Sequence, residues 1–412
     1  MGRMGLLGRM SLMGLIVLVA ACTSDVVQPV DGVDQEQEQG MPAPFQVVSY
    51  LKPFEESLGE TRTDPPAWLP AGYSVDTNHK AVGAFFTKSG SDVDTRRIWY
   101  NDFGTPDNPS DDKWYINGEG IPTGDYYIYG FMPYNTAKTV TCSANTTFED
   151  GAILTFTGLG SMMSKDVCVM VGARHGSDAD TPEYPGLRIG QFGCSMKSGG
   201  SGNENYLFLL FEHIYARLDF SFRVDEEYAK LRIIKLRELS IKGKTYTELD
   251  QSDATDMKKE GSITVYLKAN STNTSPIVND IKFTSDNASG DMDPVILFEG
   301  EEELPSDKYP AGDPLAGEYK YTDETGYVPY YNFAGNDMKV LYVLRSTYDV
   351  YDKQGNLIRS NCVADNVIIP NEVLNQSQLD RGKKYRIKLT VKPTYLYVMS
   401  EPDLNNPTVV IN

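Results

Sequence analysis

The chain has 412 residues and a formal net charge of −19, with 57 acidic side chains against 38 lysines and arginines. This charge repels phosphate backbones and anionic lipid headgroups, which argues against nucleic acid as a partner. The chain is rich in tyrosine (26) and phenylalanine (16), and its 36 glycines and 23 prolines act as turn punctuation, a composition typical of a β-rich protein.

The chain begins with the features of an export signal. Arg3 and Arg9 precede an apolar run at residues 12–21, and small residues lead up to Cys22. The run Val19-Ala20-Ala21-Cys22 resembles a bacterial lipobox, in which the thiol takes a diacylglycerol and becomes the new amino terminus. The apolar run is well short of the ~20 residues that a membrane-spanning helix needs. We therefore expect residues 1–21 to be a lipoprotein signal peptide and Cys22 to carry the lipid, including palmitate; a cysteine that happens to follow a signal is the alternative.

Residues 22–44 are predicted to form a disordered tether. Residues 23–44 carry five acidic side chains and no basic one. Large apolar groups are too few in this stretch to offset the entropy of folding. A lipid at Cys22 followed by such a tether would hold a globular body off a membrane.

A strand and a charged loop open the folded part of the chain. Residues 45–51 predict the strand, because alternation places Phe45, Val47 and Leu51 on one face. The turn-rich residues 55–66 follow, and Arg62 is the only base among them. An exposed loop with one arginine is a good site for a trypsin-like protease, although an ordinary surface arginine fits the same pattern.

Short strands separated by turn signals continue to the end of the chain and predict an all-β sandwich fold. The clearest of them are expected at residues 125–131, 206–222 and 385–391. A hairpin is expected at residues 341–361 with its turn at 352–356, and a short helix fits residues 226–230.

The domain organisation follows from length and from one linker. A chain of 412 residues suits two domains. Residues 198–203, rich in glycine and serine, form the clearest linker. We therefore predict an N-terminal β-sandwich domain at residues 45–203 and a C-terminal one at residues 204–412.

No catalytic signature is present in the sequence. A zinc-protease H-E-x-x-H, a nucleophile elbow and a P-loop are all absent. Of the three histidines, His79, His175 and His213, the last lies in an apolar run, where a hydrogen-bonded core imidazole is the better interpretation. The chain is therefore expected to be no enzyme and to use no cofactor.

The residues that bind metals give no site either. No cysteine belongs to a C-x-x-C pair or lies close to a histidine in sequence, so no metal site is expected. The acidic turn at residues 286–293 does not match an EF-hand, and a solvated loop is the better interpretation. The remaining cysteines fit either two disulfides or small buried apolar groups, and the sequence leaves their pairing open: Cys142, Cys168, Cys194 and Cys362.

The order of several motifs resembles the fimbrillin family, the pilus subunits and anchors of type V pili in Bacteroidales. These motifs are the lipobox at Cys22, the strand at 45–51 followed by Arg62, and residues 124–134, 210–220 and 379–391. By this resemblance the fold would be two transthyretin-like β-sandwich domains in tandem. The function would be that of a structural fimbrium subunit for cell adhesion.

The resemblance also implies a route of assembly. The lipoprotein would reach the cell outer membrane, where an arginine-specific protease cuts after Arg62 and releases the lipid with the strand that contains Phe45, Val47 and Leu51. Donor-strand exchange would then fill the vacated place with the C-terminal segment of another pilin subunit, in a homo- or hetero-polymer on the cell surface. The donor residues would be Leu396, Val398, Val409 and Ile411.

Other roles stay open at this point. A chain that is never cut at Arg62 would be a fimbrial anchor, and the sequence does not choose among shaft, tip and anchor or name a receptor. Arg96-Arg97 is a second candidate cut but precedes an apparent strand. A lipid-anchored surface glycan-binding protein is the other alternative, with Trp68, Trp99 and Trp114 stacking on sugar rings.

Overall fold

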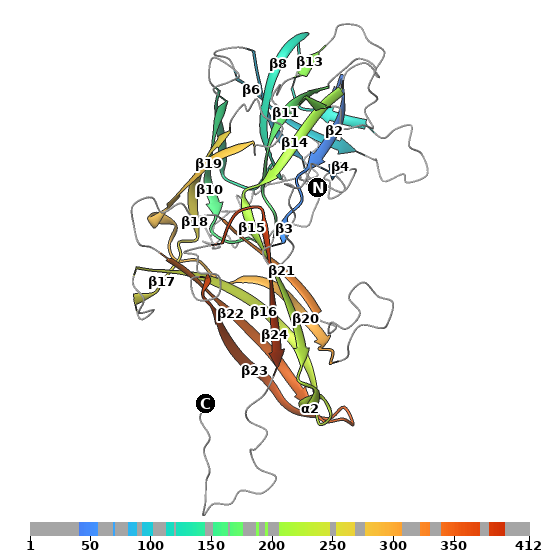
Figure 1. Ribbon diagram of the computed structural model, residues 1–412, viewed down its shortest axis with the longest axis vertical. Helices are drawn as coiled ribbons and strands as arrows, with labels where there is room; N and C mark the ends of the chain where they lie inside the picture. The colour runs from blue at the N-terminus through green and yellow to red at the C-terminus, as the bar shows by residue number, and fades with distance from the viewer. Residues whose placement is uncertain are drawn as a thin grey trace, which may run out of the picture. The chain divides into compact units, whose positions relative to one another are not determined.

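The structure, a computed structural model, describes residues 41–56, 69–70, 81–88, 93–101, 113–118, 121–144, 151–163, 165–175, 187–188, 194–196, 206–247, 253–267, 277–306, 322–329, 339–370 and 379–391. Strands form nearly all of the regular structure (Figure 1), which confirms the all-β prediction. Among the elements that the structure describes, the helical ones are η3 (Asn287–Ser289) and α2 (Glu226–Ala229), and α2 begins where the sequence predicts a short helix. In these ranges no helix is long and apolar enough to cross a bilayer.

The first sheet has eleven strands and contains most of the strands before residue 214. Its main path runs β1 (Met41–Pro42), β7 (Lys113–Ile116), β6 (Val93–Asn101), β5 (Val82–Thr87), β8 (Gly124–Met132), β11 (Cys168–His175), β14 (Tyr206–His213), β2 (Gln46–Leu51) and β4 (Leu69–Pro70). Off this path, β12 (Leu187–Arg188) pairs with β11 and β13 (Cys194–Met196) pairs with β8.

Three smaller sheets complete the fold. The second sheet runs β19 (Val278–Ser285), β18 (Glu260–Leu267), β10 (Ala152–Gly160) and β9 (Thr139–Ala144). The third runs β21 (Thr322–Pro329), β15 (Tyr215–Val224), β24 (Lys383–Val391) and β3 (Glu55–Glu56). The fourth runs β17 (Thr255–Asp256), β16 (Ile233–Tyr246), β22 (Lys339–Tyr351) and β23 (Leu357–Ile368), with β20 (Val295–Glu303) also paired to β16.

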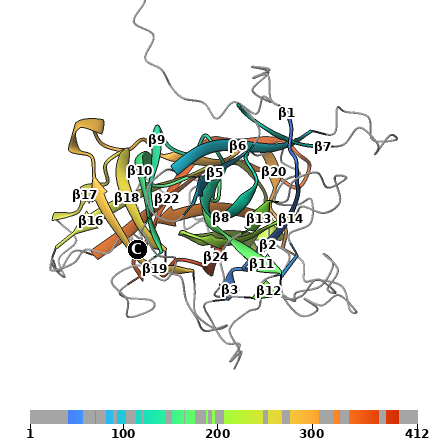
Figure 2. The same ribbon diagram turned by 90° about the horizontal axis from the view of Figure 1, so that it is seen from above.

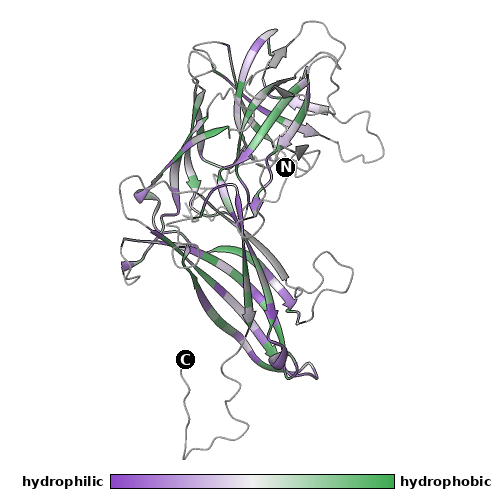
Figure 3. Ribbon diagram, in the orientation of Figure 1, coloured by the Kyte–Doolittle hydropathy of each residue, from purple (hydrophilic) through white to green (hydrophobic). Residues whose placement is uncertain are grey.

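Alternating apolar residues pack these sheets in pairs, as in a sandwich. Leu210 of the first sheet shares a buried cluster with Leu154 and Val265 of the second. Phe220 of the third sheet shares another with Leu236 of the fourth, and Figure 3 shows the alternation of hydrophobic and hydrophilic residues along the long strands. Burying each such side chain stabilises the fold by about 1.5–3 kcal/mol.

The first sheet also encloses a third cluster on its other face, which includes Phe86, Ile98, Trp114 and Leu209. The start of the described chain closes this face, because β1 and β2 lie at distant places in the strand order although only residues 43–45 separate them in sequence. Seen from above, β1 lies beside β7 and β2 beside β14 (Figure 2). Residues 41–51 therefore hold two separate parts of the sheet together.

The chain passes from the first sheet to the third at a single residue. The stretch 206–222, predicted as one strand, is β14 and β15 joined by Ile214, whose amide donates to Val167 O at 3.0 Å. Strands from both sides of residue 203 pair with each other, since β14 pairs with β11 and β18 with β10. The domains predicted at 45–203 and 204–412, and their transthyretin-like tandem arrangement, stay a prediction.

Candidate functional site

The candidate site is the place occupied by residues 41–56, called the N-terminal segment below. Its central strand β2 pairs in parallel with β14, from Gln46 opposite Tyr206 to Leu51 opposite Phe211, and it pairs antiparallel with β4 on its other side. The amide of Lys52 continues the ladder by donating to Phe211 O at 3.0 Å. The segment is therefore an internal strand of the sheet although it lies near the start of the chain.

Both ends of the N-terminal segment pair elsewhere. Upstream, β1 pairs with β7, and the Ala43 amide donates to Trp114 O at 2.8 Å. Downstream, the Glu55 amide donates to Gly382 O at 2.9 Å, and β3 pairs in parallel with β24 of the third sheet. One short stretch of chain thus contributes backbone hydrogen bonds to two sheets.

The side chains of β2 face two different cores. Phe45 is 1% exposed, and Val47 and Leu51 pack against the same cluster, so these three share a face as the alternation predicts. Val48 and Tyr50 pack on the opposite face, against the cluster between the first and second sheets. Burial raises the pKa of the Tyr50 phenol. The site between β14 and β4 therefore accepts a strand that is apolar on both faces.

A buried carboxylate lies at the end of this strand site. The side chain of Glu212, the penultimate residue of β14, is 1% exposed. It accepts hydrogen bonds from the backbone amides of Ile277, at 3.1 Å, and Val278, at 3.4 Å. A charge taken out of water in this way is costly unless hydrogen bonds and opposite charges compensate it.

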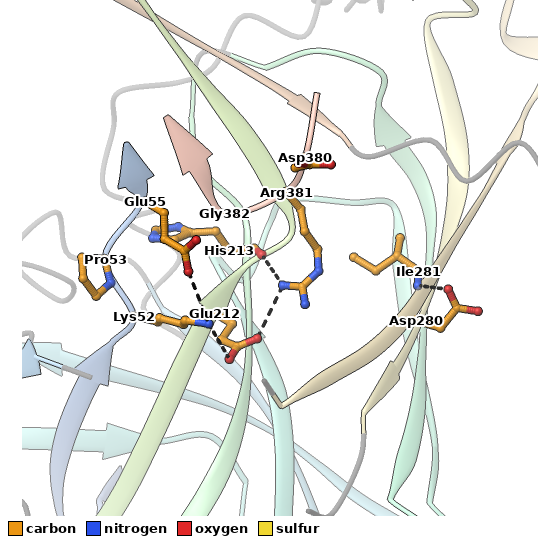
Figure 4. Close-up of a pocket in the computed structure, with 10 residues that line it drawn as sticks. All are labelled: Lys52, Pro53, Glu55, Glu212, His213, Asp280, Ile281, Asp380, Arg381 and Gly382. Carbon is orange, nitrogen blue, oxygen red and sulfur yellow. Dashed lines mark hydrogen bonds and ion pairs between the residues drawn. The ribbon is translucent and has the colours of Figure 1, made fainter. Parts of the chain in front are cut away.

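Two cations face Glu212 from different parts of the chain (Figure 4). Lys52 Nζ of the N-terminal segment lies 3.9 Å from Oε1, and Arg381 Nη1 lies 3.5 Å from Oε2. Arg381 also donates to the backbone carbonyls of His213, at 3.4 Å, and Val278, at 3.3 Å. Arg381 is therefore held by the body of the fold, whereas Lys52 comes with the segment.

These groups line a pocket of about 360 Å³. Its wall brings together the N-terminal segment, the end of β14, β19 and the turn before β24, through Lys52, Pro53, Glu55, Glu212, His213, Asp280, Ile281, Asp380, Arg381 and Gly382. Most of the lining residues are charged, so the pocket suits ion pairs and polar ligands better than an apolar ligand.

His213, next to Glu212, belongs to a second buried cluster. Its Nδ1 lies 2.6 Å from Asp166 Oδ2 and 3.4 Å from Cys168 Sγ, and the thiol lies 3.3 Å from the same carboxylate oxygen. The ring of Phe54 stacks on the imidazole with 3.5 Å between centroids. The prediction of a hydrogen-bonded core imidazole is confirmed, but no local pattern in the sequence marks Asp166 or Cys168 as its partners.

Most of the residues predicted to act in assembly lie outside the described residues. This holds for the lipid acceptor Cys22, the cleavage residue Arg62 and the donor residues Leu396, Val398, Val409 and Ile411. The strand predicted at 45–51 is present as β2, while its removal by cleavage stays a prediction. The second candidate cleavage site, Arg96-Arg97, lies within strand β6, where Arg96 forms an ion pair with Asp94 at 2.8 Å.

The surroundings of the cysteines and tryptophans bear on two predictions, the state of the thiols and the stacking of tryptophans on sugar rings. Cys142, Cys168 and Cys362 are thiols that each contact an apolar cluster. Cys168 is buried and the other two are partly buried, while the side chain of Cys194 lies outside the described residues. Burial raises the pKa of the Cys142 thiol to about 12. Trp114 is 7% exposed and packs in the core, Trp99 stacks on Tyr115 at 5.9 Å, and Trp68 lies outside the described residues. Trp114 is therefore too deeply buried to stack on a sugar ring as the glycan-binding alternative requires.

Comparison with known proteins gave matches among solved structures alone. No protein-family model and no curated protein matches the chain. A structure described as a candidate cell adhesion protein of Bacteroides uniformis is 13% identical, with a TM-score of 0.33 over 89% of this chain and 95% of that one. A candidate cell adhesion protein of Bacteroides fragilis is 11% identical, with a TM-score of 0.35 over 85% and 94%.

A fimbrial protein of Bacteroides vulgatus is 12% identical to the chain, with a TM-score of 0.30 over 83% of this chain and 95% of that one. These neighbours are adhesion and fimbrial proteins, the kind that the resemblance to fimbrillins predicts, and none of the three is named as an enzyme. Their TM-scores are too low for the likeness to support a function.

Proposed function

We propose that this chain is a non-enzymatic structural subunit of a cell-surface filament that serves adhesion, and that it polymerises by exchanging the strand β2 for a strand of another subunit. The observation that carries the proposal is the placement of the N-terminal segment. A strand that lies inside a sheet, faces two cores and yet lies near the start of the chain can be removed by one cut in the sequence that follows it. Arg62 lies six residues past the end of β3 at Glu56.

Removal of the segment would leave the remaining fold incomplete. The β14 edge would lose its parallel partner along Tyr206–Phe211, and two apolar clusters would lose Phe45 and Tyr50. At ~1 kcal/mol net for each hydrogen bond and about 1.5–3 kcal/mol for each large apolar side chain, the open form would be less stable by several kcal/mol. Such an edge binds an added strand strongly.

The C-terminal tail has the composition that this place demands. The site between β14 and β4 needs a strand with two apolar faces, because β2 presents Val47 and Tyr50 to different clusters. The tail contains five consecutive apolar residues, Tyr395-Leu396-Tyr397-Val398-Met399, and a second apolar run, Val409-Val410-Ile411. We therefore keep the assignment of Leu396, Val398, Val409 and Ile411 as donor residues. Head-to-tail insertion of this kind does not close on itself and produces a filament.

The early sequence supplies the place of assembly in this proposal. Lipid at Cys22 would tether the precursor to the outer membrane, and an arginine-specific protease that cuts after Arg62 would release the body from the lipid. The partners would be other pilin subunits, identical or different. A chain that escapes the cut would keep its lipid and its β2 strand and act as an anchor.

The tail is the part of the proposal that is easiest to test with matched variants. We expect purified chain treated with an arginine-specific protease to form ladders on a non-boiled denaturing gel. Deletion of residues 395–412 abolishes the ladders, and so does the pair Leu396→Asp and Val398→Asp, because a charge cannot enter an apolar strand site.

The pair Asn405→Asp and Asn406→Asp is the control, since it adds the same charge to the tail at positions that are already polar. This control retains the ladders. Ladders that persist in the Leu396 and Val398 double variant, or in the deletion, would rule out the tail as donor.

A further inference from the structure

The cluster of Asp166, Cys168 and His213 is built by the strand register. Cys168 opens β11 and is the cross-strand partner of His213, the last residue of β14. Asp166 precedes Cys168 by two residues, and its carboxylate reaches both the thiol and the imidazole. Cys168 is 1% exposed and His213 is 4% exposed. A thiol, an imidazole and a carboxylate thus meet in a place that is largely shielded from water.

These three donor atoms match the ligands that zinc takes in proteins. Zinc binds thiolate sulfur at ~2.3 Å and imidazole nitrogen or carboxylate oxygen at ~2.0 Å in tetrahedral geometry. Tetrahedral angles then separate the sulfur from the other two ligand atoms by about 3.5 Å, and the nitrogen from the oxygen by about 3.3 Å. The sulfur lies 3.3 Å from Asp166 Oδ2 and 3.4 Å from His213 Nδ1.

One of the three distances among these donor atoms is shorter than zinc requires. His213 Nδ1 and Asp166 Oδ2 are 2.6 Å apart, the distance of a hydrogen bond, so this distance must increase by about 0.7 Å when the proton is replaced by a metal. The Asp166 side chain is the one that can move, because it is 20% exposed and lies before the start of β11. Its second oxygen, Oδ1, is buried without a hydrogen-bond partner.

We propose that Asp166, Cys168 and His213 form a binding site for one Zn²⁺ ion. On binding, the thiol releases its proton to solvent, and the Nδ1 proton moves to Nε2, so that a neutral imidazole coordinates through the Nδ1 lone pair. The fourth position of the tetrahedron remains for water. His213 also lines the pocket of about 360 Å³, so the cluster lies next to this pocket.

The location of the site gives the metal a structural consequence. Zinc would link β11 to the end of β14, the strand against which β2 pairs. The Phe54 ring covers the imidazole while the N-terminal segment is in place. The metal therefore braces the wall of the strand site from the side opposite to the segment's own hydrogen bonds, and this brace does not depend on whether the segment is ever exchanged.

Cobalt is the direct probe, because Co²⁺ bound to a thiolate gives a near-ultraviolet charge-transfer band and visible bands typical of tetrahedral geometry. The full chain is used, with Cys22→Ser in every sample so that the lipid-acceptor thiol does not contribute. We expect one Co²⁺ per chain, both sets of bands, and displacement of Co²⁺ by Zn²⁺.

Two variants separate this site from other thiols. Cys168→Ser loses the charge-transfer band and weakens Zn²⁺ binding by about 10–100-fold or more, the range that even a second-shell change produces. Cys362→Ser, a thiol that packs on the core between the third and fourth sheets, retains the band and the affinity. Asp166→Asn, a change at a partly exposed side chain, weakens Zn²⁺ binding but leaves the circular dichroism spectrum unchanged.

A second readout covers the case in which Cys168→Ser does not fold. Zn²⁺ then raises the melting temperature of the Cys22→Ser protein and of Cys362→Ser, and it raises that of Asp166→Asn by clearly less at the same Zn²⁺ concentration. An equal rise in all three proteins would overturn the proposal. Absence of one-to-one Co²⁺ binding, or a charge-transfer band that survives in Cys168→Ser or disappears in Cys362→Ser, overturns the proposal.

Discussion

The ring of Phe54 lies against the imidazole of His213, with 3.5 Å between the ring centroids and 19° between the ring planes. Phe54 belongs to the N-terminal segment and lies between β2 and β3, whereas His213 ends β14 and belongs to the body of the fold. The contact therefore reports directly on whether the segment is in place. It also connects the strand site to the buried Asp166, Cys168 and His213 cluster.

Replacing Phe54 by alanine is expected to uncover His213. The imidazole would lose the aromatic face that shields it, so its reaction with an acylating reagent such as diethylpyrocarbonate should become several-fold faster. The rate is measured on the peptide that contains His213, by mass spectrometry. Tyr134→Ala, which removes an exposed aromatic ring stacked on Phe131, serves as control and should leave the rate unchanged; an equal increase in both variants would contradict the shielding role of Phe54.

Glu212→Gln is expected to lower the free energy of unfolding by about 1.5–3 kcal/mol, the range for losing hydrogen bonds to a buried charged group. The amide retains the size of the side chain but lacks the charge that faces Arg381 and Lys52, and its NH₂ group cannot accept a bond from a backbone amide. Urea unfolding followed by circular dichroism measures the change.

The exposed Glu302→Gln provides the comparison for Glu212→Gln, and we expect it to stay within about 0.5 kcal/mol of the unsubstituted chain. If both substitutions had the same small effect, Glu212 would not be the charged centre of the pocket.

The strands that the sequence predicted well are those whose signal is local. Alternation places Phe45, Val47 and Leu51 on one face, and the hairpin predicted at 341–361 is present as β22 and β23. Its turn forms as expected, with Asp352 accepting backbone bonds from Gln354 and Asn356 at 2.9 and 2.8 Å. Turn chemistry and side-chain alternation depend on neighbours in sequence, which a single chain displays.

The site itself depends on pairings that local patterns do not encode. Nothing in residues 45–51 says that β2 pairs in parallel with a strand that begins at Tyr206, because strand partners are fixed by tertiary packing. The break at Ile214 is hidden for the same reason, since both halves of the run are apolar. Cys168 and His213 are 45 residues apart in sequence, so sequence spacing does not reveal that they are neighbours in the fold.

Phe45→Ala tests the packing of the segment. Truncating a ring that is 1% exposed should lower the free energy of unfolding by about 3–5 kcal/mol, through lost burial and the cavity left behind. Gln46→Ala, at the exposed neighbouring position, should change it by less than about 0.5 kcal/mol. Thermal or urea unfolding measures both, and a Phe45→Ala protein as stable as Gln46→Ala would mean that the segment adds little to the fold.

The ion pair between β22 and β23 should make a small, pH-dependent contribution. Two hydrogen bonds of 2.8 Å from the Arg345 guanidinium lower the pKa of Asp365 below its ordinary value. Because the folded pKa is below the unfolded one, the stabilisation is present above about pH 4 and is lost as pH falls through the folded pKa. Arg345→Met should therefore lower the stability slightly at neutral pH and have almost no effect in strong acid, because an exposed ion pair is screened by solvent.

Urea unfolding at the two pH values checks this expectation. Arg359→Met, a change at an exposed arginine of β23, is the control and should show no such pH dependence. A cost for Arg345→Met that stays the same in strong acid would contradict the assignment to the Asp365 carboxylate.

The most direct test of strand exchange is the amino terminus of the assembled protein. The full chain and its Arg62→Gln variant are incubated with an arginine-specific protease, and the products are sequenced from the amino terminus and run on a non-boiled denaturing gel. Strand exchange predicts a stable core that begins at Thr63 and forms ladders, while Arg62→Gln keeps residues 41–56 and stays monomeric. Ladders from the uncut Arg62→Gln chain, or a core that begins at Thr63 and remains monomeric, would contradict it.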